Sequence, residues 1–117
     1  MNKINISNKV VILEKNVFGG CENLNEITIP YGMINIGDGA FEECKSLREV
    51  SIPDSVASIG DYAFWNCQSL NQITVWSNVT SIGYSAFDGC KNLTIRAFKG
   101  SYAERYALEN EIPFEEI

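Results

Sequence analysis

A period of 23 residues runs through the sequence and constrains its fold more tightly than any local pattern. Cysteine, phenylalanine and leucine recur at this spacing, as Cys21, Cys44, Cys67 and Cys90, as Phe18, Phe41, Phe64 and Phe87, and as Leu24, Leu47, Leu70 and Leu93. A unit this short cannot bury its own apolar face, so it must stack on neighbouring units. The period therefore predicts a solenoid, whose repeated surfaces suit binding and whose repeat residues carry no chemistry.

Each unit is predicted to contain one short strand and one turn. Apolar β-branched residues alternate with polar ones at residues 27–29, 50–52 and 73–75, which is typical of strands with one buried face. Stacking coil on coil would align these strands in a parallel sheet. Apolar residues spaced three apart within residues 40–47 predict a helical or 3₁₀ turn on the opposite side.

The repeat array is predicted to cover residues 1–98, as about four coils of which the first is degenerate. Glu14 in the first coil stands where the later coils have Gly37, Gly60 and Gly83. These glycines mark tight turns in which a Cβ would be unfavourable. The strand of the first coil would be an open edge, so we expect either self-association through this coil or a longer array from which the chain was cut.

Residues 99–117 are predicted to cap the array as part of the same domain. Ser101 and Glu104 form a capping-box pattern that opens a helix over about residues 102–110. Pro113 prevents the helix from continuing, and the residues after it are expected to fold back as an extended tail. The predicted fold class is an α/β repeat, a solenoid with a short parallel β-sheet and a C-terminal helical cap.

The cysteines are candidates for zinc ligands, disulfides or buried thiols, and their spacing favours buried thiols. Zinc ligands usually come in close pairs, whereas one cysteine per coil would place the sulfurs on a line, with coils about 4.8 Å apart. A disulfide between coils would need Cβ atoms closer than this, at roughly 3.5–4.5 Å. We therefore expect a column of four buried free thiols that behave as small hydrophobes.

Composition argues against several classes of function. The net charge is −6 and the nine Lys and Arg residues are spread along the chain, so nucleic acid is not an expected partner. No apolar run approaches the roughly 20 residues that span a bilayer, so membrane insertion is not expected. The chain has no histidine, which rules out Ser-His-Asp and Cys-His arrangements. We expect no enzyme activity, no cofactor and no metal.

A candidate protein-binding surface lies on the outward face of the predicted sheet. It consists of Glu26, Thr28, Glu49, Ser51, Gln72, Thr74 and Trp76. Trp76 stands where the two preceding coils have Pro30 and Pro53. Exposed tryptophan is enriched in binding hot spots, and the same residue would alternatively cover the last coil against the cap.

A thin group of aromatic residues is expected on the far side of the coils. Trp65 occupies a position held by Gly19, Glu42 and Asp88 in the other units. The residues that accompany it are Tyr31, Tyr62 and Tyr84. They form either a second contact surface or simply variable positions.

The repeat reads Cys-x-x-Leu-x-x-Ile-x-Ile-Pro-x-x-Val-x-x-Ile-Gly-x-x-Ala-Phe, and residues 44–64 follow it closely. This pattern resembles the BspA-like leucine-rich repeat, the treponemal type. Residues 93–114 resemble the segment that commonly closes such arrays. The Asn ladder of the common leucine-rich pattern is missing, because its positions here hold Gly32, Ser55 and Asn78. The resemblance implies protein recognition by bacterial surface or secreted proteins, in adhesion to host matrix or in cell–cell contact.

The expected function is therefore a non-enzymatic protein–protein recognition module in bacterial surface adhesion or host interaction. The alternative is a structural spacer or assembly unit within a larger protein. The expected location is the cell surface or the exterior if the chain is a fragment of a longer protein. It is the cytoplasm if Met1 is the natural start, because residues 1–6 hold no continuous apolar signal segment.

Overall fold

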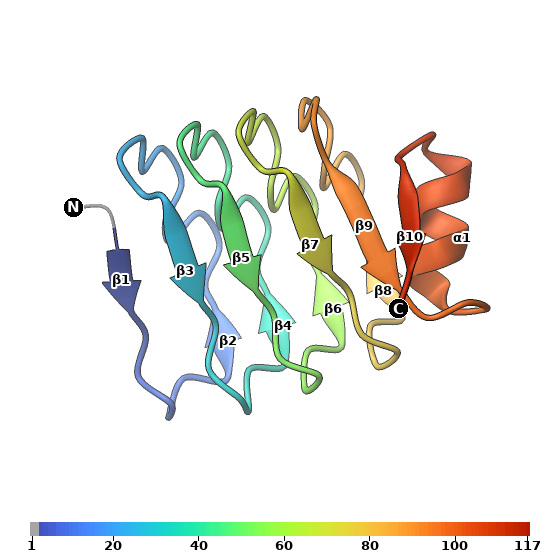
Figure 1. The fold of residues 1–117 in the computed structure, drawn as a ribbon. Coiled ribbons are helices and arrows are strands. Elements are labelled where there is room, and N and C mark those ends of the chain that lie inside the picture. Colours follow the sequence, from blue (N-terminus) through green and yellow to red (C-terminus); the bar gives the residue numbers. More distant parts are fainter. Residues whose placement is uncertain (1–2) are drawn as a thin grey trace.

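A parallel sheet runs along one side of a stack of coils (Figure 1). The structure is a computed structural model that describes residues 3–117. Within this range the sheet has six strands in the order β1-β3-β5-β7-β9-β10. They are β1 (Lys3–Asn5), β3 (Glu26–Thr28), β5 (Glu49–Ser51), β7 (Gln72–Thr74), β9 (Thr94–Ala97) and β10 (Phe114–Glu116). We call it the long sheet, and it confirms the predicted solenoid with parallel strands.

A second parallel sheet lies behind the long sheet in Figure 1 and was not foreseen from the sequence. Its strands are β2 (Ile12–Leu13), β4 (Asn35–Ile36), β6 (Ser58–Ile59) and β8 (Ser81–Ile82). Each is only two residues long, and one apolar residue of each pair faces the core. We call this the short sheet.

The predicted helical or 3₁₀ turn at residues 40–47 is wrong, because the backbone donors of this stretch alternate between two kinds of partner. Cys44 N donates to Phe41 O within its own coil at 3.1 Å. Phe41 N instead donates to Ala63 O in the next coil at 2.7 Å. A 3₁₀ helix needs consecutive bonds between residues three apart. Every second donor here joins coil to coil, so the stretch is a series of turns.

The register between strands follows the period until the fourth coil. Ile27 pairs with Val50 and Val50 with Ile73, each 23 residues apart. Ile73 then pairs with Ile95, only 22 residues further on. The missing residue hides β9 from a strict 23-residue pattern, and β9 begins a further turn of the solenoid.

The C-terminal cap has the predicted helix and the predicted extended tail. The helix α1 (Tyr102–Glu109) begins after Ser101, whose Oγ accepts a hydrogen bond from Glu104 N at 3.2 Å. Glu104 Oε1 accepts from Gly100 N at 2.7 Å, one residue earlier than in the usual capping box. After the helix, β10 pairs in parallel with β9 and closes the long sheet. Figure 1 shows α1 covering this end of the stack.

Four phenylalanine rings stack through the centre of the solenoid. The ring centroids are 5.5 Å apart for Phe18–Phe41, 5.1 Å for Phe41–Phe64 and 5.2 Å for Phe64–Phe87. Phe87 meets the ring of Tyr106 in α1 edge-on at 6.1 Å. The column is thus closed by the cap at one end, whereas Phe18 at the other end is only half-buried.

Two positions in every coil have a left-handed backbone. The first column consists of Asn16, Gly39, Tyr62 and Ser85, and the second of Gly20, Glu43, Asn66 and Gly89. This conformation is unfavourable by roughly 1–2 kcal/mol for residues other than glycine, although asparagine tolerates it well. Tyr62, with φ of 57°, is the bulkiest residue in either column.

Candidate protein-binding surface

The predicted surface residues on the long sheet form two rows that run across the strands. Glu26, Glu49 and Gln72 stand opposite one another in the register of β3, β5 and β7. Thr28 and Ser51 form the start of the second row, and Thr74 follows them on β7. The middle residue of each strand is buried while its neighbours face outward, as the alternation of side chains in a strand requires.

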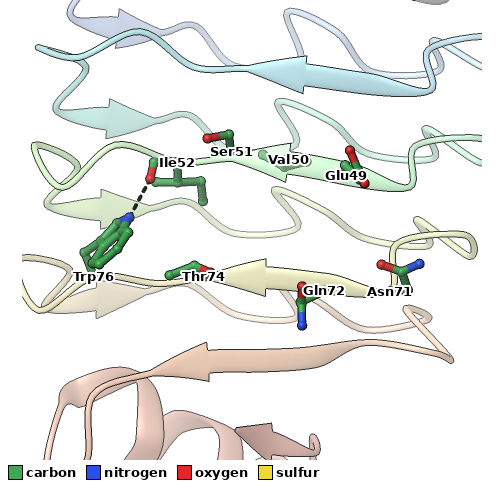
Figure 2. Close-up of a pocket in the computed structure, with 8 residues that line it drawn as sticks. All are labelled: Glu49, Val50, Ser51, Ile52, Asn71, Gln72, Thr74 and Trp76. Carbon is green, nitrogen blue, oxygen red and sulfur yellow. Dashed lines mark hydrogen bonds between the residues drawn. The ribbon is translucent and has the colours of Figure 1, made fainter. Parts of the chain in front are cut away.

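A cavity of about 290 Å³ lies on this face between β5 and β7 (Figure 2). Its lining is Glu49, Val50, Ser51, Ile52, Asn71, Gln72, Thr74 and Trp76. Five of the predicted residues are therefore brought together around one hollow. Glu26 and Thr28 lie on β3, one strand further along, and do not line it. Both of these side chains are exposed, so the two rows of outward-facing residues extend beyond the cavity onto β3.

Trp76 stands at the end of β7 and joins three neighbouring coils. Its Nε1 donates a hydrogen bond to the backbone oxygen of Ile52 at 2.7 Å, which Figure 2 shows as a dashed line. Its ring lies 6.2 Å from that of Phe98, tilted by 53°. Part of the side chain remains exposed and lines the cavity. The indole is thus oriented by two contacts while one side of it faces the hollow.

Two polar residues of this face were missed from the sequence. Asn71 lines the cavity from just before β7. Arg96 on β9 stands in register with Thr74 and forms an ion pair with Glu115 on β10, Nε to Oε1 2.6 Å. The signal for Arg96 was the shortened repeat, because a spacing of 22 rather than 23 residues places it in the Thr74 row.

The cysteine column consists of free thiols, each of the later three hydrogen-bonded to the coil before it. The sulfurs of Cys44, Cys67 and Cys90 donate at 3.1 Å to the backbone oxygens of Phe18, Phe41 and Phe64. The prediction of free thiols is confirmed. The prediction that all are buried is wrong for Cys21 and Cys90, which are partly exposed because they stand at the ends of the column.

The buried thiols are poor nucleophiles. Burial raises the pKa of Cys44 to about 11. The pKa of Cys67 is raised as well. The larger cause is a hydrogen bond with the Cys90 thiol, and burial is the second. The thiolate is the reactive form, so these two sulfurs are chemically inert at neutral pH. In the range 3–117, no three His, Cys, Asp or Glu side chains are grouped as a metal ion would require.

The described part of the chain contains no helix that is long and apolar enough to cross a bilayer. Its helix α1 has eight residues, well short of the roughly 20 needed.

Solved structures of bacterial leucine-rich repeat proteins are similar to this chain. A leucine-rich cell surface protein from Faecalibacterium prausnitzii is 28% identical with a TM-score of 0.62, over 92% of this chain and 34% of that one. The T. pallidum leucine-rich repeat protein is 26% identical with a TM-score of 0.58, over 74% of this chain and 52% of that one. The chain thus spans about a third to a half of these proteins.

No curated protein matches the sequence at a significant level. The model of the BspA-type leucine-rich repeat region matches residues 1–112 with six copies, which is nearly the whole chain. This match agrees with the coil stack, with its in-register parallel strands and with the C-terminal cap described above. The chain belongs to the BspA-type leucine-rich repeat family.

Proposed function

We propose that the chain is a non-enzymatic protein-binding module that presents the outward face of its long sheet to a protein ligand. Repeat arrays of this kind offer extended surfaces formed by neighbouring coils. The proposed setting is a bacterial surface or secreted protein engaged in adhesion or host interaction. The similar protein from Faecalibacterium prausnitzii, described as a cell surface protein, supports this setting.

The observation that carries the proposal is the partly exposed Trp76 beside the cavity between β5 and β7. Here the hydrogen bond to Ile52 and the contact with Phe98 fix the indole while it remains accessible. Pre-oriented aromatic side chains next to a pocket are the usual anchors of protein interfaces.

The alternative, a structural spacer or assembly unit, is supported by a different part of the molecule. In the first coil Val17 is 45% exposed, whereas Ala40, Ala63 and Ala86 at the same repeat position of the later coils are buried. Apolar side chains at an open end of a solenoid favour stacking on another coil. This function needs no ligand on the long sheet.

A binding experiment with a panel of purified extracellular-matrix proteins tests the proposal. The Trp76→Ala variant should weaken binding to the matrix protein that is recognised by about 30-fold, the loss typical of a hot spot. Ser51→Arg should also block binding, because Ser51 is exposed on a strand and lines the cavity. Thermal unfolding of each variant shows that its fold is intact.

The matched control is Leu108→Ala, which truncates an exposed apolar side chain on α1 that lies outside the long sheet and lines neither cavity. It should leave binding to the matrix protein unchanged. Binding that survives both Trp76→Ala and Ser51→Arg, or binding to none of the panel, contradicts the proposal.

A further inference from the structure

A second cavity, of about 130 Å³, lies on the turns that follow β4 and β6 and is lined by Glu42, Tyr62 and Trp65. None of these residues lines the cavity on the long sheet. Tyr62 meets Trp65 edge-on at a centroid distance of 6.4 Å, and it meets Tyr84 edge-on at 5.8 Å. We call Tyr62, Trp65 and Tyr84 the turn aromatic cluster.

The backbone of Tyr62 shows that the cluster is not a requirement of the repeat. Its left-handed conformation is shared by Asn16, Gly39 and Ser85 at the same position of the other coils. Those residues are small, whereas Tyr62 carries a large ring that remains 39% exposed. Strained, exposed residues of this kind tend to occur at binding sites, where the strain places a side chain that the fold itself does not need.

One carboxylate lines the cavity and others lie nearby in the repeat. Glu42 lines the cavity from the coil before Trp65, and Asp88 occupies the same repeat position in the coil after it. The Asp61 Oδ1 accepts a hydrogen bond from the backbone nitrogen of Tyr84 at 2.8 Å, which places a third carboxylate near the backbone of the cluster. The cavity lining itself includes one acidic and no basic side chain. Negative charge next to aromatic faces favours a cation.

The size of the cavity limits which chemical groups can bind there. Pockets for whole small molecules usually enclose roughly 300–1,000 Å³. A space of about 130 Å³ instead suits the head group of one side chain. Arginine fits better than lysine, because its planar guanidinium stacks on an aromatic ring and pairs with a carboxylate in a fixed geometry.

We propose that the turn aromatic cluster, together with Glu42, binds an arginine side chain presented by a partner protein. The guanidinium stacks on Trp65 and is paired by the Glu42 carboxylate, and the ring of Tyr62 forms a wall of the site. This site is separate from the long sheet, and the proposal does not depend on binding there.

A fluorescence titration tests the site in the full chain. The Trp76→Phe background leaves Trp65 as the only tryptophan, so its emission reports this cavity alone. N-acetyl-arginine amide should change the emission with saturation in the millimolar range, and added salt should weaken the effect. The control probe is N-acetyl-citrulline amide, which has the same shape without the charge. It should bind at least about tenfold more weakly.

Two variants in this background separate binding from a structural role. Glu42→Gln should weaken arginine binding at least about threefold. Tyr62→Gly should weaken it at least about fivefold and leave the melting temperature unchanged or raised, because Gly39 has the same conformation at the equivalent position.

A purely structural cluster predicts the opposite pattern, with a lowered melting temperature in Tyr62→Gly and unchanged emission in the titration. Equal binding of the citrulline probe, or saturation by a neutral sugar but not by arginine, also overturns the proposal. Trp76 does not line this cavity, so failure of the titration and failure of the matrix-protein experiment can be told apart.

Discussion

One glycine in each of three successive coils determines how closely two coils can approach. A Cβ added to Gly60 would lie 2.6 Å from the backbone nitrogen of Asp38 in the coil before, and one added to Gly83 would lie 2.5 Å from that of Asp61. Neither glycine has a left-handed backbone, so close approach rather than backbone freedom explains them. The Asp38 carboxylate also accepts a hydrogen bond from Asp61 N at 2.8 Å, which secures the same junction.

Replacing Gly60 with alanine should therefore lower the free energy of unfolding by about 1–3 kcal/mol, the usual effect of overpacking. Urea unfolding followed by circular dichroism measures this. Gly19→Ala is the matched control, because a Cβ there has no neighbour nearer than 3.4 Å and the backbone is not left-handed. Similar losses in the two variants would mean that coil contact is not the reason for the glycine.

The cysteine column gives a prediction about chemical access. At pH 8 a thiol reagent should label Cys21 and Cys90 in the native protein, because both are partly exposed. Cys44 and Cys67 should remain unlabelled until a denaturant is added, since each is fully buried. Mass spectrometry of the labelled peptides distinguishes the two pairs. Rapid native labelling of Cys67 would show that the coils open at the centre of the stack.

The raised pKa of Cys44 predicts a loss of stability at alkaline pH. An unperturbed thiol titrates near 9, whereas the folded protein holds Cys44 protonated to about 11. Between these values the unfolded state binds fewer protons, so stability is complete below pH 9 and falls as the pH rises towards 11. Melting temperatures measured from pH 8 to 11 should fall more steeply for the wild type than for Cys44→Ala. Equal slopes would show that Cys44 is not protected.

At the residue scale, the period predicts which side chains stack but not what each one bonds to. It places Cys67 and Cys44 in one column and suggests a small buried thiol. The bond from the Cys67 sulfur to the Phe41 oxygen depends on the direction of the thiol within its turn. Similarly, Trp76 is recognisable in the sequence because it breaks the proline pattern, but its hydrogen bond to Ile52 could be identified only from the structure.

Among the elements, the stacked phenylalanines link four successive coils through the core. Phe64 is fully buried, with Phe41 on one side and Phe87 on the other at about 5 Å. Phe64→Ala should lower the free energy of unfolding by roughly 3–5 kcal/mol. Phe18→Ala should have a smaller effect, because Phe18 stacks on Phe41 and is only half-buried. Thermal unfolding of both variants compares them, and equal effects would mean that position in the stack does not matter.

Elements with a long local pattern could be predicted, and those without one could not. Alternating residues predict β3, β5 and β7, and the Ser101–Glu104 pattern predicts the start of α1. The short sheet was missed because two residues carry no period. The 3₁₀ turn was predicted wrongly because turn bonds and coil-to-coil bonds alternate, which a spacing of three cannot reveal. β9 was missed because one residue is absent from the period before it.

At the scale of the whole molecule, the two ends of the solenoid differ in how they are covered. At the C-terminal end, β10 extends the long sheet and α1 packs its buried Ala103 and Ala107 against the stack. The cap also reaches back to the short sheet, where the Tyr102 hydroxyl accepts a hydrogen bond from Ile82 N at 3.1 Å. At the other end, β1 is an edge strand and the first coil exposes several apolar side chains.

The open end leads to a prediction about self-association. Exposed edge strands and apolar ends of repeat arrays favour pairing with another chain. Light scattering should show the apparent mass of the protein rising with concentration. The Val17→Lys variant should remain monomeric, because it places a charge at the repeat position that is exposed only in the first coil. The control is Leu108→Lys at the capped end, where Leu108 is 66% exposed, and it should associate like the wild type.

A protein that stays monomeric at every concentration would show that the degenerate first coil is an adequate cap. Loss of association in Leu108→Lys alone would assign the contact to the helical end instead.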